Sequence, residues 1–176
     1  MKRSVPFRHS AKQGCEFASR HRSEGFTIVE MLTVVAIFGI LAMIAAPSFS
    51  SLIASQRAGA VATDLLVGLI DSRSEAIKRN VDATFAPKSG GWKAGWQTTV
   101  PDPNNVGQTI LIEDHPTTTG IAIAGPNGVV YQSSGRVQGN AAPCFAITAT
   151  QGSSVVQRWV AVDLSGRPLV RTTACT

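Results

Sequence analysis

Histidine and cysteine are scarce in this chain, with three copies of each among its 176 residues. Beyond residue 25 the only histidine is His115, which lies beside Pro116 in a polar segment that we expect to be a loop. No Cys-x-x-Cys pair, glycine-rich phosphate loop or pair of catalytic carboxylates occurs in the sequence. A metal site needs several such ligands close together, and a nucleophile–histidine–acid site would have to use His115. We therefore expect no metal, no cofactor and no enzymatic activity.

Net charge is also nearly absent from most of the chain. Of the total of +5, residues 1–25 contribute +4, from six basic and two acidic side chains. The basic character therefore belongs to a short head, and it does not indicate a nucleic-acid-binding domain. The head contains proline and glycine and has no apolar periodicity. We interpret residues 1–25 as a basic leader that stays in the cytoplasm.

A long apolar stretch follows the head. Residues 26–46 form a run of 21 in which Glu30 is the only charged residue, and as a helix they would span about 30 Å, the thickness of a bilayer's hydrocarbon core. Basic residues precede the run, which orients the N-terminus toward the cytoplasm. We expect residues 26–47 to form a transmembrane helix. The alternative is a secretory signal peptide cut after Ala46, but Glu30 and Pro47 argue against it.

A second helical pattern occupies residues 48–80. Apolar side chains recur there at steps of three and four with polar residues between them, which predicts an amphipathic helix that ends near Asn80. Pro47 separates the two helical segments and cannot donate a backbone hydrogen bond to Met43, so we expect a kink or a loosened turn there. The predicted apolar stripe contains Leu52, Ile53, Ala58, Ala62, Leu65, Leu66, Leu69, Ile70, Ala76 and Ile77.

The composition changes after Asn80, where Gly, Pro, Thr, Val and Asn dominate. Short apolar runs alternate with turn signals and predict eight strands, at 81–86, 95–100, 108–113, 119–123, 128–132, 143–149, 155–164 and 168–174. A sheet of this size needs cover on one face, and the amphipathic helix cannot bury its own stripe. We predict an α+β fold in which a long N-terminal helix packs on a small antiparallel β domain, residues 81–176.

The three cysteines divide between the head and the β domain. Cys15 lies in the head, whereas Cys144 and Cys175 lie in the last third of the chain. If the head is removed and the rest reaches an oxidising compartment, the remaining pair is a candidate disulfide. The alternative is two buried free thiols.

Four residues of the apolar region carry a resemblance to type IV pilins and type II secretion pseudopilins. In that family a basic leader ends in Gly, a Phe follows, an acid stands at the fifth mature position, and a Pro lies near position 22. Gly25, Phe26, Glu30 and Pro47 fall on those places. The resemblance implies cleavage between Gly25 and Phe26 by a prepilin peptidase, followed by N-methylation of Phe26.

The same resemblance supplies a reason for Glu30. A subunit that enters a filament places its α-amine among apolar helices, where an unpaired charge is costly. Glu30 of one subunit can pair with the Phe26 amine of the next, which makes the acid a register device for head-to-tail assembly. The alternative is an acid that snorkels to the surface or is neutral in a lone membrane anchor.

The globular part is similar to the GspH/FimT group of minor pilins, through "SQRAGAVATDLLVGLIDSRSEAIKRN", "GWKAGW", "GVVYQSSGRV" and "VAVDLSGRPLVR". The resemblance implies a pilin-like fold, an inner-membrane anchor and a periplasmic C-terminal domain. It implies incorporation into a type IV pilus or type II secretion pseudopilus. The expected partners are other pilins or pseudopilins, the prepilin peptidase, the inner-membrane assembly platform and membrane lipid.

Two further features have competing interpretations. Trp92 and Trp96 form either a platform for ligand stacking or, as is more common, a cap on the hydrophobic core with indole N–H groups that reach carbonyls. Arg167 is expected at a hairpin tip and Arg171 on the returning strand. Because FimT-like pilins are associated with DNA binding through a C-terminal Gly-Arg motif, "GRPLVR" is a candidate DNA contact in DNA uptake. The alternative is a solvated basic edge that blocks strand aggregation.

Overall fold

The computed structural model of the protein describes residues 25–117 and 119–175, without the side chains of residues 45–47. The expected leader before Gly25 and the cysteine within it, Cys15, lie outside the described residues. By its internal contacts the chain divides into two units, Met1–Gly39 and Ile40–Thr176. The second unit contains every strand.

One helix, α1, runs from Ile28 to Arg79 over 52 residues. It ends where the sequence predicts, because Asn80 adopts a left-handed backbone conformation with φ of 54°. The Asn80 N–H donates to the Ile77 carbonyl and the Val81 N–H to the Ala76 carbonyl, the paired bonds of a Schellman C-cap. The backbone is helical through Pro47, and the kink or loosened turn expected there stays a prediction.

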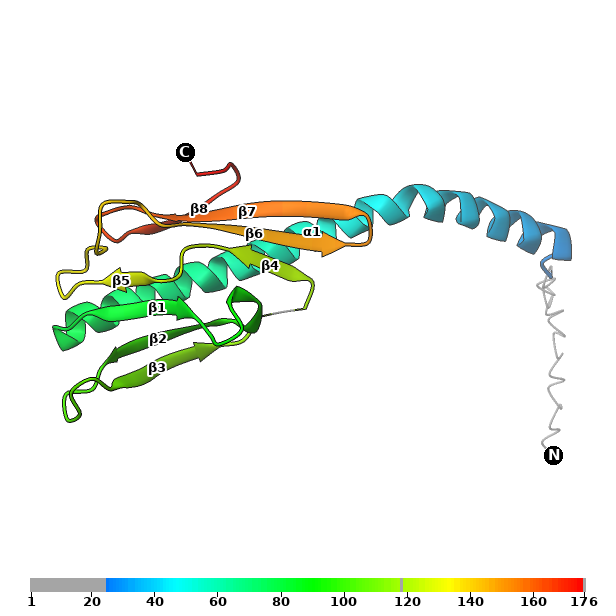
Figure 1. The fold of residues 1–176 in the computed structure, drawn as a ribbon. Coiled ribbons are helices and arrows are strands. Elements are labelled where there is room, and N and C mark those ends of the chain that lie inside the picture. Colours follow the sequence, from blue (N-terminus) through cyan, green and yellow to red (C-terminus); the bar gives the residue numbers. More distant parts are fainter. Residues whose placement is uncertain (1–24, 118, 176) are drawn as a thin grey trace, which may run out of the picture. The chain divides into compact units, whose positions relative to one another are not determined.

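Eight antiparallel strands follow, in two sheets of four with the orders β3-β2-β1-β5 and β4-β6-β7-β8 (Figure 1). The predicted α+β class and the eight strands are confirmed, and the finding beyond them is that the strands divide into two sheets. The elements are β1 Ala83–Pro87, the 3-10 helix η1 Trp92–Ala94, β2 Trp96–Pro101, β3 Thr109–His115, β4 Ile121–Ala124, β5 Val129–Tyr131, β6 Cys144–Gln151, β7 Ser154–Val162 and β8 Pro168–Arg171.

One face of α1 is buried against the strands. Its buried members recur at the three- and four-residue steps of a helix face, and they are Ala54, Ala58, Val61, Ala62, Leu65, Gly68, Leu69, Ser72 and Ala76. Four members of the predicted stripe are instead exposed: Leu52, Ile53, Ile70 and Ile77. Ala54 and Ala58 pack against Ala149 of β6. These small side chains let the helix approach the sheet closely, whereas the larger Leu52 and Ile53, which were predicted to be buried, are exposed.

The two tryptophans belong to the core, as the commoner interpretation predicts. Trp96 is 1% exposed, and the Trp92 Nε1–H donates to the Pro126 carbonyl at 3.2 Å. Trp96 does not form the expected bond to a carbonyl, because its buried indole N–H has no hydrogen-bond partner among the described residues. The expectation that His115 lies in a loop is wrong, because it is the last residue of β3 and pairs with Trp96. Its imidazole stacks on the Trp96 indole with ring centroids 4.3 Å apart. This contact stabilises the pairing of the last residue of β3, directly before Pro116.

A polar contact joins α1 to the first sheet inside this apolar core. Ser72 and Thr98 are the two buried polar residues among those described. The Ser72 hydroxyl donates to the Gly68 carbonyl at 2.7 Å and lies 2.7 Å from the Thr98 hydroxyl. Because the single Ser72 proton is used on Gly68, Thr98 is the donor in the second bond.

This contact predicts a stability effect of Ser72→Ala. The substitution leaves the buried Thr98 hydroxyl unpaired, so we expect the free energy of unfolding to fall by about 1–3 kcal/mol. Adding Thr98→Val removes that hydroxyl, and the double variant should be more stable than Ser72→Ala alone. Denaturant titration of the full chain in detergent measures both. A double variant no more stable than the single one would contradict the bonding scheme.

Candidate functional site

The helix α1 begins at a cap that includes one of the predicted assembly residues. The backbone N–H of Glu30 donates to the Thr27 hydroxyl at 3.1 Å, so Thr27 is the N-cap and Glu30 the third helical residue of a Thr-x-x-Glu sequence. A carboxylate in the first turn also interacts favourably with the helix dipole. Glu30 is exposed and forms no ion pair within the described residues. Phe26, four residues before it, is 75% exposed.

The first turns of α1 expose apolar side chains on every face. Each large hydrophobic residue from Ile28 to Ile44 is at least 40% exposed. By length and composition alone, Ser48–Arg79 is the described segment that passes as a membrane span, and Ile28–Ile44 is a shorter apolar helix. Burial separates the two, since Ser48–Arg79 contributes the face that the strands cover. The uncovered apolar surface lies in Ile28–Ile44.

Two hairpin turns with the same Ser-Gly-Arg sequence occur at residues 134–136 and 165–167. They close the five-residue segments 132–136 and 163–167. In each segment the first N–H donates to the arginine carbonyl and the glycine N–H donates to the first carbonyl, at N···O distances of 2.7–3.1 Å. Both glycines are buried, and both arginines, Arg136 and Arg167, are exposed. The two turns therefore present their arginines in the same way.

These turns come from different parts of the β domain and lie against one another. Gly135 and Gly166 have positive φ values of 77° and 85°. A side-chain carbon on Gly166 would overlap the carbonyl oxygen of Gly135, so only glycine permits both the turn and the contact. The same Gly135 carbonyl accepts a hydrogen bond from Arg73 Nε of α1 at 2.9 Å. Arg73 thus supports the paired turns from beneath.

The charges around the second turn are ordered by hydrogen bonds. Asp163 accepts from the Ser165 hydroxyl at 2.6 Å and from the Arg167 backbone N–H at 2.9 Å, and these bonds hold the pKa of Asp163 below its usual range. Beneath the turns Tyr131 is fully buried, and burial raises the pKa of its hydroxyl while nearby Arg73 opposes the rise. The turn that carries Arg167 is therefore held in one conformation.

The structure places Arg167 on the turn between β7 and β8 and Arg171 at the end of β8, as predicted. Their separation of four positions in the sequence corresponds to about 13 Å of extended strand. The structure instead brings Arg167 close to the turn of Arg136, a residue that the sequence analysis did not single out. The repeated Ser-Gly-Arg triplet was the signal that would have found it.

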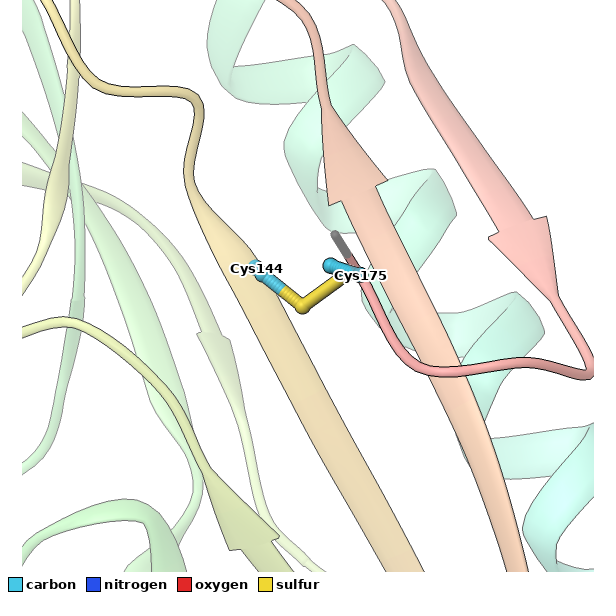
Figure 2. The surroundings of a disulfide bond; sticks show 2 residues. All are labelled: Cys144 and Cys175. Atoms are coloured by element: carbon cyan, nitrogen blue, oxygen red, sulfur yellow. A yellow bond between two sulfur atoms is a disulfide. The ribbon is translucent and has the colours of Figure 1, made fainter.

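A disulfide joins Cys144 to Cys175, with Cα atoms 6.3 Å apart. Figure 2 shows the chain after β8 turning back across β7, so that Cys175 reaches Cys144 at the start of β6. The bond fastens the segment after β8 to the first residue of β6. The sequence analysis gave this pair as a candidate disulfide.

Comparisons with known proteins agree with this architecture. Two crystal structures of the type IV minor pilin FimU from Pseudomonas aeruginosa are similar, with TM-scores of 0.53 and 0.55 at 18% and 16% identity. They cover 67% and 69% of this chain and 97% and 95% of the FimU chains. A long N-terminal helix packed on antiparallel sheets is thus the pilin fold. A comparison with curated proteins finds no match.

The model of the family described as type II transport protein GspH matches residues 61–166, and the prokaryotic N-terminal methylation motif matches residues 20–46. The first match covers more than half of the chain, so the chain belongs to the GspH family. It is a minor pilin or pseudopilin, a class of structural proteins that interact with other pilins and with a prepilin peptidase. The methylation motif and the apolar helix indicate a membrane-anchored member.

The disulfide predicts a measurable contribution to stability. It closes a loop with a sequence separation of 31, and in the chain-entropy model such a bond stabilises the fold by about 3–4 kcal/mol. We expect Cys144→Ser/Cys175→Ser to lower the free energy of unfolding by about that amount. Denaturant titration with and without a reductant measures it. Two free thiols in these positions of the native protein, found by alkylation and mass spectrometry, would contradict the bond.

Proposed function

We propose that a prepilin peptidase removes the leader after Gly25 and that Phe26 is then N-methylated. In this scheme residues 26–47 cross the inner membrane with the N-terminus in the cytoplasm, and residues 48–80 and 81–176 lie in the periplasm. The assembly platform then transfers the subunit into a type II secretion pseudopilus or a type IV pilus. The observation that carries the proposal is an exposed carboxylate, Glu30, at the head of an uncovered apolar helix.

The uncovered helix requires two successive environments. Burial of apolar surface contributes about 25 cal/mol per Å², and the large apolar side chains of Ile28–Ile44 are at least 40% exposed. A bilayer supplies this cover before assembly, and a bundle of neighbouring pilin helices supplies it afterwards. Pro47 removes one backbone hydrogen bond between this segment and the rest of α1, which lets the helix adjust as it passes from one environment to the other.

Glu30 requires a cation in the second environment. The described residues give it no ion pair, and an ionised carboxylate that is buried among apolar helices without a partner is strongly unfavourable. Cleavage after Gly25 creates the α-amine of Phe26, four residues away in the chain. On a neighbouring subunit that amine neutralises Glu30 only when the two helices are in the correct axial register. The pairing therefore selects the register as well as the partner.

The pairing predicts that Glu30→Ala leaves membrane insertion intact and abolishes incorporation into the fibre. Glu30→Gln keeps the size and polarity of the side chain but removes its charge, so it should fail in the same way. Cell fractionation measures insertion, and immunoblots of sheared fibres measure incorporation.

The matched control is Thr27→Ala, which removes the cap oxygen but keeps the carboxylate and should be incorporated. Wild-type levels of either Glu30 variant in sheared fibres would exclude the pairing. Mass spectrometry of the fibre subunit should find a methylated Phe26 as its first residue.

A second candidate function, DNA binding during uptake, is favoured by the paired Ser-Gly-Arg turns. Exposed guanidinium groups make charge-assisted bonds with phosphate, and two of them on adjacent rigid turns suit a phosphodiester chain better than one. The sequence analysis proposed Arg167 and Arg171 for this role. The geometry supports the pair Arg136 and Arg167, with Arg171 further along β8.

Salt dependence tests this candidate. Each phosphate contact contributes about 0.9 to the slope of log affinity against log salt concentration for duplex DNA, so Arg136→Gln/Arg167→Gln should lower the slope by about 2. Fluorescence anisotropy of labelled DNA with the full chain in detergent measures it. Arg57→Gln/Arg158→Gln makes the same charge change elsewhere and should keep the wild-type slope. Equal salt slopes for the two double variants would rule out DNA binding at these turns.

A further inference from the structure

The β6–β7 hairpin reaches farther along α1 toward the N-terminal end of that helix than the other strands do (Figure 1). Its tip is held to the helix by a 2.8 Å hydrogen bond between the hydroxyls of Ser154 and Ser50. Ser50 lies three residues after Pro47, at the limit of the predicted membrane segment. Beside it the exposed apolar surface continues through Phe49, Leu52 and Ile53. The hairpin tip therefore lies on the part of α1 that follows the apolar segment.

This end of the domain carries charge of one sign. Residues 48–63 of α1, together with β4, β6 and β7, contain no Asp or Glu, and their charged residues are Arg57 and Arg158. Arg57 donates to the Gln151 side-chain oxygen at 2.8 Å, and Arg158 donates to the Ser55 hydroxyl at 3.0 Å. Both bonds tie hairpin to helix through neutral groups. Within the described residues neither guanidinium meets a carboxylate.

The position along the chain fits a membrane surface. Counted as a helix from Ile28, about 30 Å of hydrocarbon ends near Ser48, and a headgroup layer of about 5–7 Å then extends to about Leu52. Arg57 follows Ser48 by nine residues, or about 13 Å. Long arginine side chains can lay their stems along apolar surface and direct their charged ends toward an interface. The exposed tip at Gly152 and Ser153 lies nearer still, because the flanking Ser154 contacts Ser50.

We propose that the β6–β7 tip, with Arg57 and Arg158, is a docking surface for the anionic phospholipid headgroups of the leaflet from which α1 emerges. The inference rests on the proposed membrane anchoring of the chain. The lipid phosphates supply the counter-charge that the domain lacks here, and the exposed Phe49, Leu52 and Ile53 lie in the boundary layer. The contact holds the domain on the membrane before assembly and is broken when the subunit is extracted.

A reporter at the hairpin tip tests the docking. Ser153→Trp is introduced into the full chain, which is reconstituted in nanodiscs of phosphatidylcholine alone or of an equal mixture with phosphatidylglycerol. Brominated lipids quench the added tryptophan when it lies at the bilayer, and the parent chain corrects for the native tryptophans. We expect stronger quenching in the anionic discs, lost at high salt. Since each arginine near an anionic surface contributes about 1 kcal/mol, the pair shifts the docking equilibrium by about 30-fold.

Three paired variants decide the cause. Arg57→Gln/Arg158→Gln should remove the quenching that depends on phosphatidylglycerol, and Arg57→Lys/Arg158→Lys should retain it, because charge rather than guanidinium geometry is recognised. Arg136→Gln/Arg167→Gln, with the same change in net charge, should also retain it. Equal quenching in both lipids, loss in the lysine variant, or equal loss in the Arg136/Arg167 variant would overturn the proposal.

Failure of the proposed membrane anchoring gives a different result. A full chain that does not enter nanodiscs of either composition would overturn the anchoring and this inference together. A chain that enters both kinds of disc equally, yet shows no dependence of quenching on phosphatidylglycerol, would overturn the headgroup contact alone.

Discussion

The constraint on which the structure depends is that one helix must satisfy two different solvents. From Ala54 to Ala76 its buried face is covered by two sheets, and the opposite side meets water. From Ile28 to Ile44 its apolar side chains are exposed all round, which water penalises in proportion to their area. At its C-terminal end α1 is closed by the hydrogen-bonded cap at Asn80. At its N-terminal end the apolar side chains of Ile28–Ile44 stay exposed. The exposed apolar side chains of the N-terminal end are stable only against lipid or other helices, and the proposed function of the chain depends on that contact.

Local signals in the sequence were sufficient for much of this architecture. The helix end near Asn80 follows from a residue that tolerates a left-handed conformation, and the strand positions follow from apolar runs between turn residues. Pairing between distant segments was not readable in the same way. The division into two sheets depends on β5 joining β1 and β4 joining β6, and no local pattern specifies those partners. The exposed Leu52 and Ile53 were predicted inside because periodicity does not tell which of two adjacent helix faces the alanines bring close to a sheet.

The candidate sites also divide into those with a local sequence signal and those that depend on contacts between distant segments. Gly25, Phe26 and Glu30 lie within six residues of one another, so the sequence alone is enough to propose their roles. The paired arginine turns are a tertiary feature, since residues 132–136 follow β5 of the first sheet and residues 163–167 join β7 to β8 in the second. The buried glycines hold the turns together, while Arg73 and the Asp163 hydrogen bonds fix their conformation. The repeated Ser-Gly-Arg triplet is visible in the sequence, but it does not tell that the two turns lie against one another.

The charges that lack a partner in the described subunit differ in how strongly each requires one. Glu75 pairs with Lys78 and Arg79, and Lys88 pairs with Asp114, but exposed pairs of this kind stabilise a fold by at most about 1 kcal/mol. Arginines exposed to water lose little by remaining unpaired, so an anionic ligand at Arg136 and Arg167 is optional for the stability of the subunit. A carboxylate that enters an apolar bundle has no such freedom, because desolvation penalises its charge until a cation is adjacent. The proposed assembly contact of Glu30 would therefore neutralise a charge that needs a partner in an apolar bundle, whereas the proposed contact of the arginines concerns charges that are stable in water without one.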